Sequence, residues 1–307
     1  MIRAIKSGMK AGLRAAVRWR MQWLPLSEKS AETWTQRIKQ WPALFDDTLA
    51  TRVVALDHRV KMQVGIVDHI ERQLWFHREW DRPVKVVLES LLAPGDTYID
   101  LGANIGYFTL LASRLVGPGG TVVAIEPSVR ALRKLTSHLW LNRCENVLLI
   151  SCAAGNHWSR GELGLATESN IGGSALVVNH QRPTVTEAVW LAPLDDLVQG
   201  LSLKPKLIKL DLEGFEFAAL NGAQQLISQS LPWIVCEVTE KLLRKFGSST
   251  EQLFTLLQKL GYRPFRLSLN SAHPAWESVD WQMCAAVEQQ DVVFVPPNGD
   301  LAAVKLA

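Results

Sequence analysis

The chain has 307 residues, of which 48% are hydrophobic and 21% charged, and its formal net charge is +3. This size and balance predict an ordinary globular protein of one large or two modest domains, give no support to nucleic-acid binding, and leave no apolar run near the ~18 residues of a membrane span. Four scattered cysteines without a C-x-x-C pair argue against a disulfide framework or a structural zinc site and favour a reducing, cytoplasmic compartment.

The first 24 residues, here called the N-terminal arm, carry six basic residues and no acidic one. Apolar side chains from Ile5 to Trp23 recur at helical spacing, opposite most of the basic positions, which predicts a basic amphipathic helix. Such a helix often binds a membrane surface. The alternative is that its apolar stripe packs on the body of the protein or on a second subunit. We therefore expect either peripheral contact with the inner face of the membrane through residues 1–24 or a packing role, which includes a homo-oligomer.

The segment that follows the arm is unusually rich in tryptophan, and its composition differs from the rest of the chain. Helices with breaks at Pro25 and Pro42 are expected up to residue 48, then a strand, a turn and a strand over 51–66. Further helices are predicted over 67–80 and 83–92. We expect a domain over 1–82 that serves substrate recognition or oligomerisation, and a cofactor-binding domain over 83–307. Half of the 12 tryptophans lie in the first part: Trp19, Trp23, Trp34, Trp41, Trp75 and Trp80.

The run from Tyr98 to Thr109 predicts a buried strand, a glycine turn and a helix. Gly102 and Gly106 let the backbone turn sharply and approach a ligand. Asp100 ends the strand, where it can fix the turn or accept a hydrogen bond from a ligand amine. The next predicted strand ends at Glu126, whose carboxylate can accept hydrogen bonds from both hydroxyls of a ribose. Together these features predict a nucleoside-binding half-site.

The spacing of the glycines indicates which nucleoside binds. A dinucleotide fingerprint, G-x-G-x-x-G, cradles a pyrophosphate, but here Asn104 takes the second glycine position and Tyr107 the third. S-adenosylmethionine carries an ammonium and a carboxylate and has no phosphate, so the Asp-x-Gly-x-x-x-Gly turn suits it better. The sequence predicts S-adenosyl-L-methionine as the cofactor, and an NAD-dependent oxidoreductase is the rival enzyme class.

Beyond this motif, strands and helices alternate regularly, which predicts a mostly parallel sheet with helices on both faces. Residues 156–200 interrupt the alternation and predict one or two hairpins. Two last strands, near 262–269 and 291–295, are expected to close the sheet as an antiparallel pair. Ligands of such sheets bind beyond the carboxyl ends of the strands. The polar or small residues predicted there are Asp100, Glu126, Ala153, Asp211 and Glu237.

The segment Lys209–Gly214 places charged residues at the end of an otherwise apolar strand. Period-two alternation puts Lys209, Asp211 and Glu213 on one side of the chain. Buried charges are costly, which favours a functional role. The structural alternative is a Lys–Asp ion pair with Glu213 capping the next helix. The histidines are dispersed and no dense ligand cluster occurs, so no metal site is predicted, and a divalent metal held by Asp211 and Glu237 is the open alternative.

Several of these motifs, in this order, resemble the FkbM family of S-adenosylmethionine-dependent methyltransferases over roughly residues 85–270. The resemblance implies an α/β, Rossmann-like sheet of seven mostly parallel strands with the last strand reversed, preceded here by an N-terminal helical and β-hairpin extension. It also implies methyl transfer to a hydroxyl of a glycan, glycolipid or secondary metabolite, with Gly102, Asn104, Gly106 and Glu126 lining the cofactor site. The motifs are Asp100–Gly106, Glu126-Pro127, Leu194–Asp196, Lys209–Gly214 and Asn221–Ala223.

An alcohol is a poor nucleophile until its proton is leaving, so a general base is expected. Asp211 is the first candidate, Glu213 and Glu237 are alternates, and Lys209 is an orienting charge. The rival outside enzymology is a cofactor-binding or membrane-associated interaction protein without chemistry. The identity of the methyl acceptor has no readable code in the sequence.

Overall fold

The structure is a computed structural model, and it describes residues 51–165, 170–177, 185–269, 274–286, 288–302 and 304. The N-terminal arm and the helices expected up to residue 48 lie outside these residues. The chain divides into two compact units, Met1–Trp80 with Thr167–Asn170, and Asp81–Ala166 with Ile171–Ala307. Each unit is considered by itself below.

The described part of the first unit contains the hairpin and the helix that the sequence predicts. Strands β1 (Arg52–Ala55) and β2 (Lys61–Val64) pair antiparallel across the short helix η3 (Asp57–Arg59). Helix α3 (His69–His77) follows, and its N-cap Asp68 accepts a hydrogen bond from the backbone of the first turn. The buried apolar side chains of this unit are Val54, Val60, Met62, Val64, Ile66, Leu74 and Trp75.

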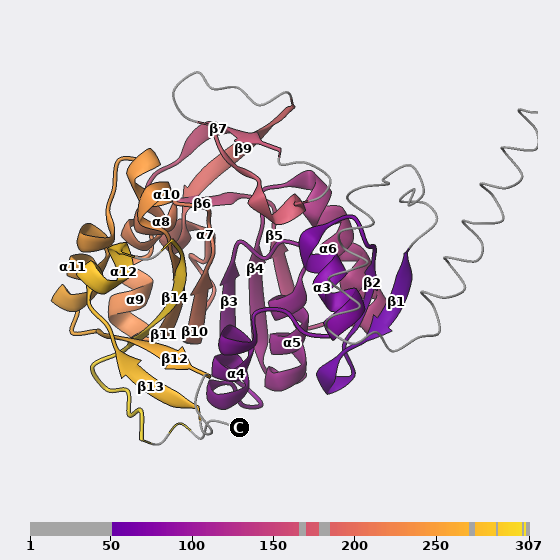
Figure 1. The fold of residues 1–307 in the computed structure, drawn as a ribbon, viewed down its shortest axis with the longest axis horizontal. Coiled ribbons are helices and arrows are strands. Elements are labelled where there is room, and N and C mark those ends of the chain that lie inside the picture. The colour runs from indigo at the N-terminus through magenta and orange to yellow at the C-terminus, as the bar shows by residue number, and fades with distance from the viewer. Residues whose placement is uncertain are drawn as a thin grey trace, which may run out of the picture. The chain divides into compact units, whose positions relative to one another are not determined.

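The second unit is built on one twisted sheet of eight strands (Figure 1). The five strands β5, β4, β3, β10 and β11 run parallel, whereas β14 is antiparallel to both of its neighbours, β11 and β12. In spatial order the strands are β13 (Ala275–Ser278), β12 (Arg263–Ser268), β14 (Gln290–Val295), β11 (Trp233–Val238), β10 (Pro205–Leu210), β3 (Thr97–Leu101), β4 (Thr121–Ile125) and β5 (Val147–Ile150).

The predicted fold class is confirmed, and the predicted strand count needs one correction. The reversed last strand β14 lies between β11 and β12, so seven strands follow the expected plan. The eighth, β13, extends the edge beyond β12. Sequence reasoning missed β13 because this four-residue edge strand lacks a buried face: none of its residues is fully buried.

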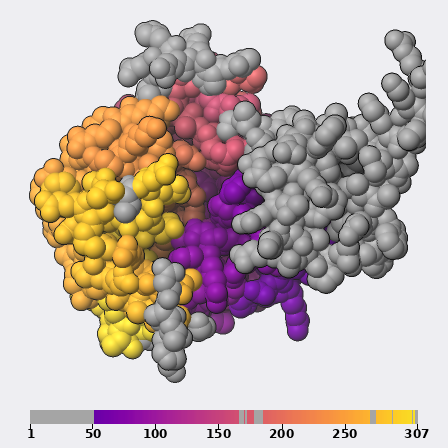
Figure 2. Space-filling model, in the orientation of Figure 1, coloured from indigo at the N-terminus to yellow at the C-terminus, as the bar shows by residue number. Residues whose placement is uncertain are grey.

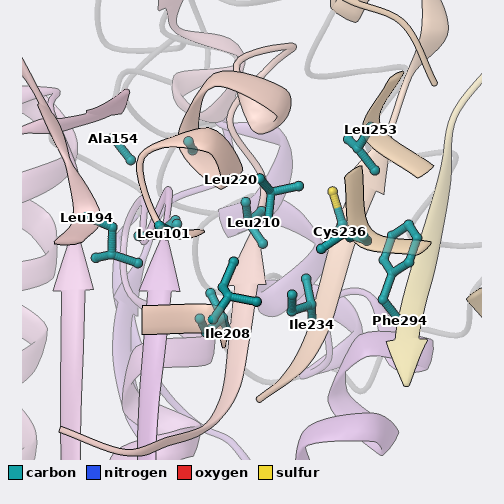
Figure 3. Packing of buried hydrophobic residues seen from close by; sticks show 14 of the residues in the cluster. Leu101, Ala154, Leu194, Ile208, Leu210, Leu220, Ile234, Cys236, Leu253 and Phe294 are labelled. Atoms are coloured by element: carbon teal, nitrogen blue, oxygen red, sulfur yellow. The ribbon is translucent and has the colours of Figure 1, made fainter. Parts of the chain in front are cut away.

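Helices cover both faces of the sheet. Helices α4 (Arg82–Leu91), α5 (Tyr107–Val116) and α6 (Val129–Asn142) pack on one face. The other face carries the larger apolar core, part of which Figure 3 shows between the central strands and helices α8 and α11. Its helices are α7 (Leu194–Leu197), α8 (Glu216–Asn221), α9 (Gln224–Ser230), α10 (Glu240–Lys245), α11 (Thr250–Lys259) and α12 (Trp281–Ala285). In Figure 2 the orange and yellow surface of this C-terminal part forms one flank of the unit.

Four strands from the described parts of residues 153–193 form a second sheet, in the region where the sequence predicts hairpins. Its central pair is antiparallel, β7 (Ser159–Gly164) with β9 (Thr186–Pro193). The short strands β6 (Ala153–Gly155) and β8 (Ala175–Leu176) flank this pair, and η4 (Ile171–Gly173) precedes β8. Ala153 is predicted at the carboxyl end of a strand of the main sheet, but that strand, β5, ends earlier, at Ile150. The chain then leaves the main sheet, and Ala153 begins the second one.

Candidate active site

The glycine turn after β3 is shaped by the protein around it. Gly102 and Gly106 have φ of +80° and +92°, a left-handed conformation that side chains rarely adopt. A Cβ at Gly102 would collide with the backbone carbonyl of Asp211, and one at Gly106 would collide with the side chain of Leu135. The glycines are therefore required because β10 and α6 approach the turn. That they also let the backbone approach a ligand stays a prediction, and Gly102 lines the cavity described below.

Glu126 fastens this turn to the end of β4. One carboxylate oxygen accepts a hydrogen bond from the backbone N–H of Asn104 and the other from that of Ser128, both at 2.8 Å. Glu126 is 7% exposed, and burial raises its pKa to about 7 in spite of these two hydrogen bonds. Each carboxylate oxygen has a second lone pair. Acceptor capacity therefore remains for the hydroxyls of a ribose.

Asp100 lies on the face of the sheet that α5 covers. It is 1% exposed, and one of its oxygens accepts a hydrogen bond of 2.6 Å from the Thr109 hydroxyl. Its other oxygen, Oδ1, has no hydrogen-bond partner among the described residues. Burial raises the pKa of this carboxyl above its usual value. The geometry makes Asp100 an internal support of the turn, on the same face as Lys209.

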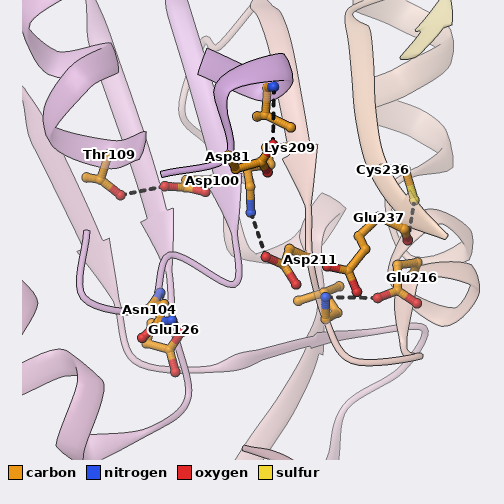
Figure 4. A network of polar contacts seen from close by, with 12 residues as sticks. Asp81, Asp100, Asn104, Thr109, Glu126, Lys209, Asp211, Glu216, Cys236 and Glu237 are labelled. Carbon is orange, nitrogen blue, oxygen red and sulfur yellow. Dashed lines mark hydrogen bonds and ion pairs between the residues drawn. The ribbon is translucent and has the colours of Figure 1, made fainter. Parts of the chain in front are cut away.

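Lys209 and Asp211 form an ion pair at the end of β10 (Figure 4). The Lys209 ammonium lies 3.2 Å from Asp211 Oδ2 and 5.3 Å from the centre of the Phe108 ring. Burial by itself would lower the pKa of Lys209, but the carboxylates of Asp211 and Asp100 raise it above its usual value. Lys209 is thus a buried cation held by its acidic neighbours, whereas the side chain of Asp211 is 38% exposed.

The turn after Asp211 directs Glu213 toward the same space. Glu213 has a left-handed φ of 53°, and such strained backbone is often found at functional sites. Glu216 stabilises the turn by accepting hydrogen bonds from the backbone of Leu212 at 2.9 Å and Gly214 at 3.1 Å. Helix α8 has no side-chain cap at its N-cap residue Phe215, so Glu213 does not have the capping role that we considered, and the turn is held by Glu216. Burial and the charge of Asp211 raise the pKa of Glu213 to about 7.

Glu237 lies near the end of β11, on the same face as Lys209. Its carboxylate accepts a hydrogen bond of 2.7 Å from the Gln289 side chain. Burial, followed by the nearby charge of Asp211, raises its pKa to about 9. A carboxyl with this pKa holds its proton at neutral pH, so Glu237 is a weaker candidate base than Asp211.

One cavity brings together six of the ten predicted site residues. Gly102, Asn104, Glu126, Ala153, Asp211 and Glu213 line it, whereas Asp100, Gly106, Lys209 and Glu237 are not part of its lining. Its empty space, counted out to the open side, is about 640 Å³. Sequence reasoning missed the other lining residues: Ile125, Pro127, Cys152, Ala154, Leu163, Gly172, Ser174, Ala175, Leu176, Leu212 and Phe215.

The missed residues divide into two kinds. Cys152 and Ala154 flank the predicted Ala153, so their position at a strand end was a usable signal. Leu163 and Leu176 come from the second sheet, and only the pairing of β7 with β8 brings them to the cavity. No local pattern in the sequence could have identified that pair.

The residues present fit a nucleoside cofactor with a charged amino-acid part. The walls of the cavity combine apolar side chains with polar groups, Asn104, Glu126 and Asp211 among them. The side-chain oxygen of Asn104 is buried and has no partner among the described residues, so it can accept a hydrogen bond from a ligand. Within the same described residues, no group of three or more His, Cys, Asp or Glu side chains could hold a metal ion.

Two further motifs from the sequence have a structural explanation. Asp195 accepts hydrogen bonds at 2.9 Å from the backbone N–H groups of Gln225 and Leu226, and so holds the first turn of α9. Its own backbone N–H donates to the carbonyl of Gly222, also at 2.9 Å. The Leu194–Asp196 and Asn221–Ala223 motifs therefore join two segments of the fold and do not line the cavity.

Two features define a Rossmann-like methyltransferase fold. In the strand order, β14 lies reversed between β11 and β12, and the glycine turn after β3 is hydrogen-bonded to Glu126, an acidic residue that follows β4. Residues 100–264 match the family model described as the methyltransferase FkbM domain. The chain belongs to that family.

Individual proteins resemble this chain over parts of their length. A crystal structure of the methyltransferase FkbM from Methylobacillus flagellatus is 19% identical, with a TM-score of 0.43 over 73% of this chain and 54% of that one. An S-adenosylmethionine-dependent O-methyltransferase from Thermotoga maritima is 14% identical, with a TM-score of 0.40 over 79% and 77%. An arsenite methyltransferase from Halobacterium salinarum is 34% identical over 58 residues, which are 19% of this chain and 15% of that protein.

Proposed function

We propose that this protein transfers a methyl group from S-adenosylmethionine to a hydroxyl group of a glycan, glycolipid or secondary metabolite. The observation that carries the proposal is that the glycine turn, Glu126 and the Asp211–Glu213 segment line one cavity. The first two suit a nucleoside, and the third supplies carboxylates for proton transfer beside it. The family to which the chain belongs supports methyl transfer. The choice of a hydroxyl acceptor rests on the resemblance and on the carboxylate at the end of β10.

In this proposal each residue has one task. S-adenosylmethionine supplies the electrophilic methyl group. Glu126 binds the ribose hydroxyls, and the amide oxygen of Asn104 accepts a hydrogen bond from the cofactor. Asp211 accepts the proton of the acceptor hydroxyl while the oxygen attacks, a contribution of ~10²–10⁴ in rate for a typical general base. Lys209 holds the Asp211 carboxylate in position from its buried side.

The first experiment separates the proposed function from its rivals. A thermal-shift comparison should show stabilisation by S-adenosylhomocysteine and none by NAD, because the cavity has no pyrophosphate cradle. Stabilisation by NAD alone would favour the oxidoreductase. Incorporation of labelled methyl into a cell extract then distinguishes an enzyme from a protein that only binds the cofactor. Metabolites extracted with and without the gene should differ by one CH₂ in the acceptor.

Glu126→Ala should lower the affinity for S-adenosylhomocysteine at least tenfold, which corresponds to about 1.4 kcal/mol. The substitution removes the ribose acceptor and also leaves the N–H groups of Asn104 and Ser128 without a partner, a cost of about 1–3 kcal/mol for each buried group. Isothermal titration calorimetry measures the first effect and denaturant unfolding the second. Glu187→Ala is the control, because Glu187 accepts a backbone N–H of α6 at 3.0 Å outside the cavity. Equal affinities in both variants would remove Glu126 from the site.

We also propose that residues 1–82 and the second sheet select the acceptor, while residues 83–307 hold the cofactor. The second sheet contributes Leu163 and Leu176 to the cavity wall. A cytoplasmic location fits the four cysteines, which are all unpaired. No helix in the described part of the chain is long and apolar enough to cross a bilayer.

The N-terminal arm gives a separate prediction. If it lies on a membrane, the full-length protein should bind vesicles with anionic lipids at low salt, and binding should weaken as salt screens the six basic residues. A protein that lacks residues 1–24 should lose this binding and keep its affinity for S-adenosylhomocysteine. Vesicle sedimentation measures the first property. Full-length protein that ignores anionic vesicles at low salt would leave the packing role, which gel filtration of both forms then tests.

A further inference from the structure

Carboxyl groups outnumber cations where β10 and β11 end. Lys209 is the only lysine or arginine among the described residues of the second unit that is fully buried. Its charge interacts with three carboxyl groups, those of Asp211, Asp100 and Asp81. Asp81 is the N-cap of α4, where it accepts a hydrogen bond from the backbone of Val84. Figure 4 shows Lys209 reaching Asp211 with Asp81 and Asp100 close by.

More acidic groups surround this set, and the exposed Lys245 is a further cation near one of them, Glu213. Glu237 and Asp291 are directly opposite each other on the paired strands β11 and β14. Glu213 and Glu216 approach from the turn after β10 and from α8, and Oε2 of Glu216 is buried with no hydrogen-bond partner among the described residues. We call Asp81, Asp100, Asp211, Glu213, Glu237 and Asp291 the carboxyl cluster.

The cluster cannot be fully ionised when the site is empty, because one buried ammonium cannot offset six carboxylates in a region of low dielectric. The pKa values of the cluster are raised, as this excess of carboxyl groups over cations requires. Burial and then the charge of Asp211 raise the pKa of Glu237 to about 9, while burial and then the charge of Asp81 raise that of Asp291 well above its usual value. Burial also raises the pKa of Asp81 to about 6. Some of these groups therefore carry protons at neutral pH.

We propose that the empty site stores protons on the carboxyl cluster and releases at least one of them when a ligand of net positive charge binds. This inference rests on the proposed function. S-adenosylmethionine carries a sulfonium, an ammonium and a carboxylate, so its net charge is +1. S-adenosylhomocysteine has a neutral thioether in place of the sulfonium, and its net charge is zero. The cluster thus discriminates between the cofactor and the product that remains after methyl transfer.

Glu237 is the group whose proton we expect to leave. The charged groups that act on its carboxyl are Asp211, Asp291, Glu213 and Glu216, and the amide of Gln289 donates a hydrogen bond to it. All of these groups are acidic or neutral. An additional positive charge in the cavity therefore favours ionisation of Glu237.

Calorimetric titration of the full-length protein with each ligand between pH 6 and 8.5 tests the inference. Affinity for S-adenosylmethionine should rise with pH by up to about tenfold per unit, the limit for release of one proton, and affinity for S-adenosylhomocysteine should change by less than about twofold per unit. The heat of binding of S-adenosylmethionine should also differ between two buffers of different ionisation enthalpy, since the released proton is taken up by the buffer.

Two substitutions and a control test whether the carboxyl cluster is the source of the released proton. Glu237→Gln keeps the size of the side chain and should reduce both the proton release and the preference for S-adenosylmethionine. Asp81→Asn preserves a helix N-cap and should reduce the preference as well, which keeps the test decisive if Glu237→Gln does not fold. Glu145→Gln changes the net charge equally at an exposed position and should behave as wild type.

The outcomes distinguish a failure of the proton release from a failure of the proposed function. Binding of both ligands with the same pH dependence and no buffer-dependent heat would overturn the proton release and leave the proposed function intact. Binding of neither ligand would contradict the proposed function and this inference together. A wild-type response in both cluster variants would show that the discrimination arises elsewhere.

Discussion

Asp211→Asn should reduce methyl transfer by ~10²–10⁴ and leave cofactor binding near normal, the usual loss when a general base is removed. The substitution keeps the size of the side chain and one oxygen for Lys209, but it removes the negative charge and the basicity. Asp211 lines the cavity with a partly exposed side chain, whereas Lys209 contacts it from the buried side. Transfer of labelled methyl into a cell extract measures the rate, and calorimetry with S-adenosylhomocysteine measures binding.

The control for this substitution is Asp280→Asn, the same chemical change at the N-cap of α12, where Asn also caps. It should retain wild-type activity. Loss of binding and of folding in Asp211→Asn would instead identify Asp211 as a structural partner of Lys209. Wild-type turnover would transfer the role of base to Glu213, whose pKa of about 7 suits proton transfer near neutral pH.

Lys209→Met should lower the free energy of unfolding by about 3–5 kcal/mol at pH 7, because the loss of one partner leaves buried carboxylates without a counter-charge. Asp211 and Asp100 are the two groups most affected. Denaturant unfolding measures the change from the midpoint and slope of the transition. Lys206→Met is the matched control, since Lys206 lies on the same strand with an exposed side chain, and it should change stability by less than about 0.5 kcal/mol.

The pH dependence of this variant has a definite sign. Without Lys209 the folded-state pKa of the Asp100 and Asp81 carboxyls, already raised by burial, rises further, so the stability that they contribute is present at low pH and is lost as the pH rises through that value. The difference between variant and wild type should therefore shrink on acidification from pH 7 toward pH 4. A difference that stays constant over this range would show that lost packing, and not charge, causes the destabilisation.

Much of the fold was predictable because its signals are local. The apolar strands β3, β4, β10 and β11 carry their own pattern, and the glycine turn between β3 and α5 is marked by residues that adopt positive φ. Their order along the chain, alternating with helices, restricts the sheet to few topologies. The edge strand β13 and the early end of β5 escaped prediction, because short strands at sheet edges depend on their partners more than on their own sequence.

The sequence by itself predicted the class of cofactor and determined the acids at the strand ends, since these depend on residue types at fixed spacing within strand–turn–helix units. Only the tertiary structure decided which of those residues line the cavity and which are buried structural supports. It turned Asp100 and Lys209 inward, gave the capping of the turn to Glu216, and tied Gly102 to β10 and Gly106 to α6. It also brought Leu163 and Leu176 to the cavity and added Asp81 and Asp291 to the acids around Lys209. The physical reason is that burial and charge balance arise between segments distant in sequence, so no local pattern encodes them.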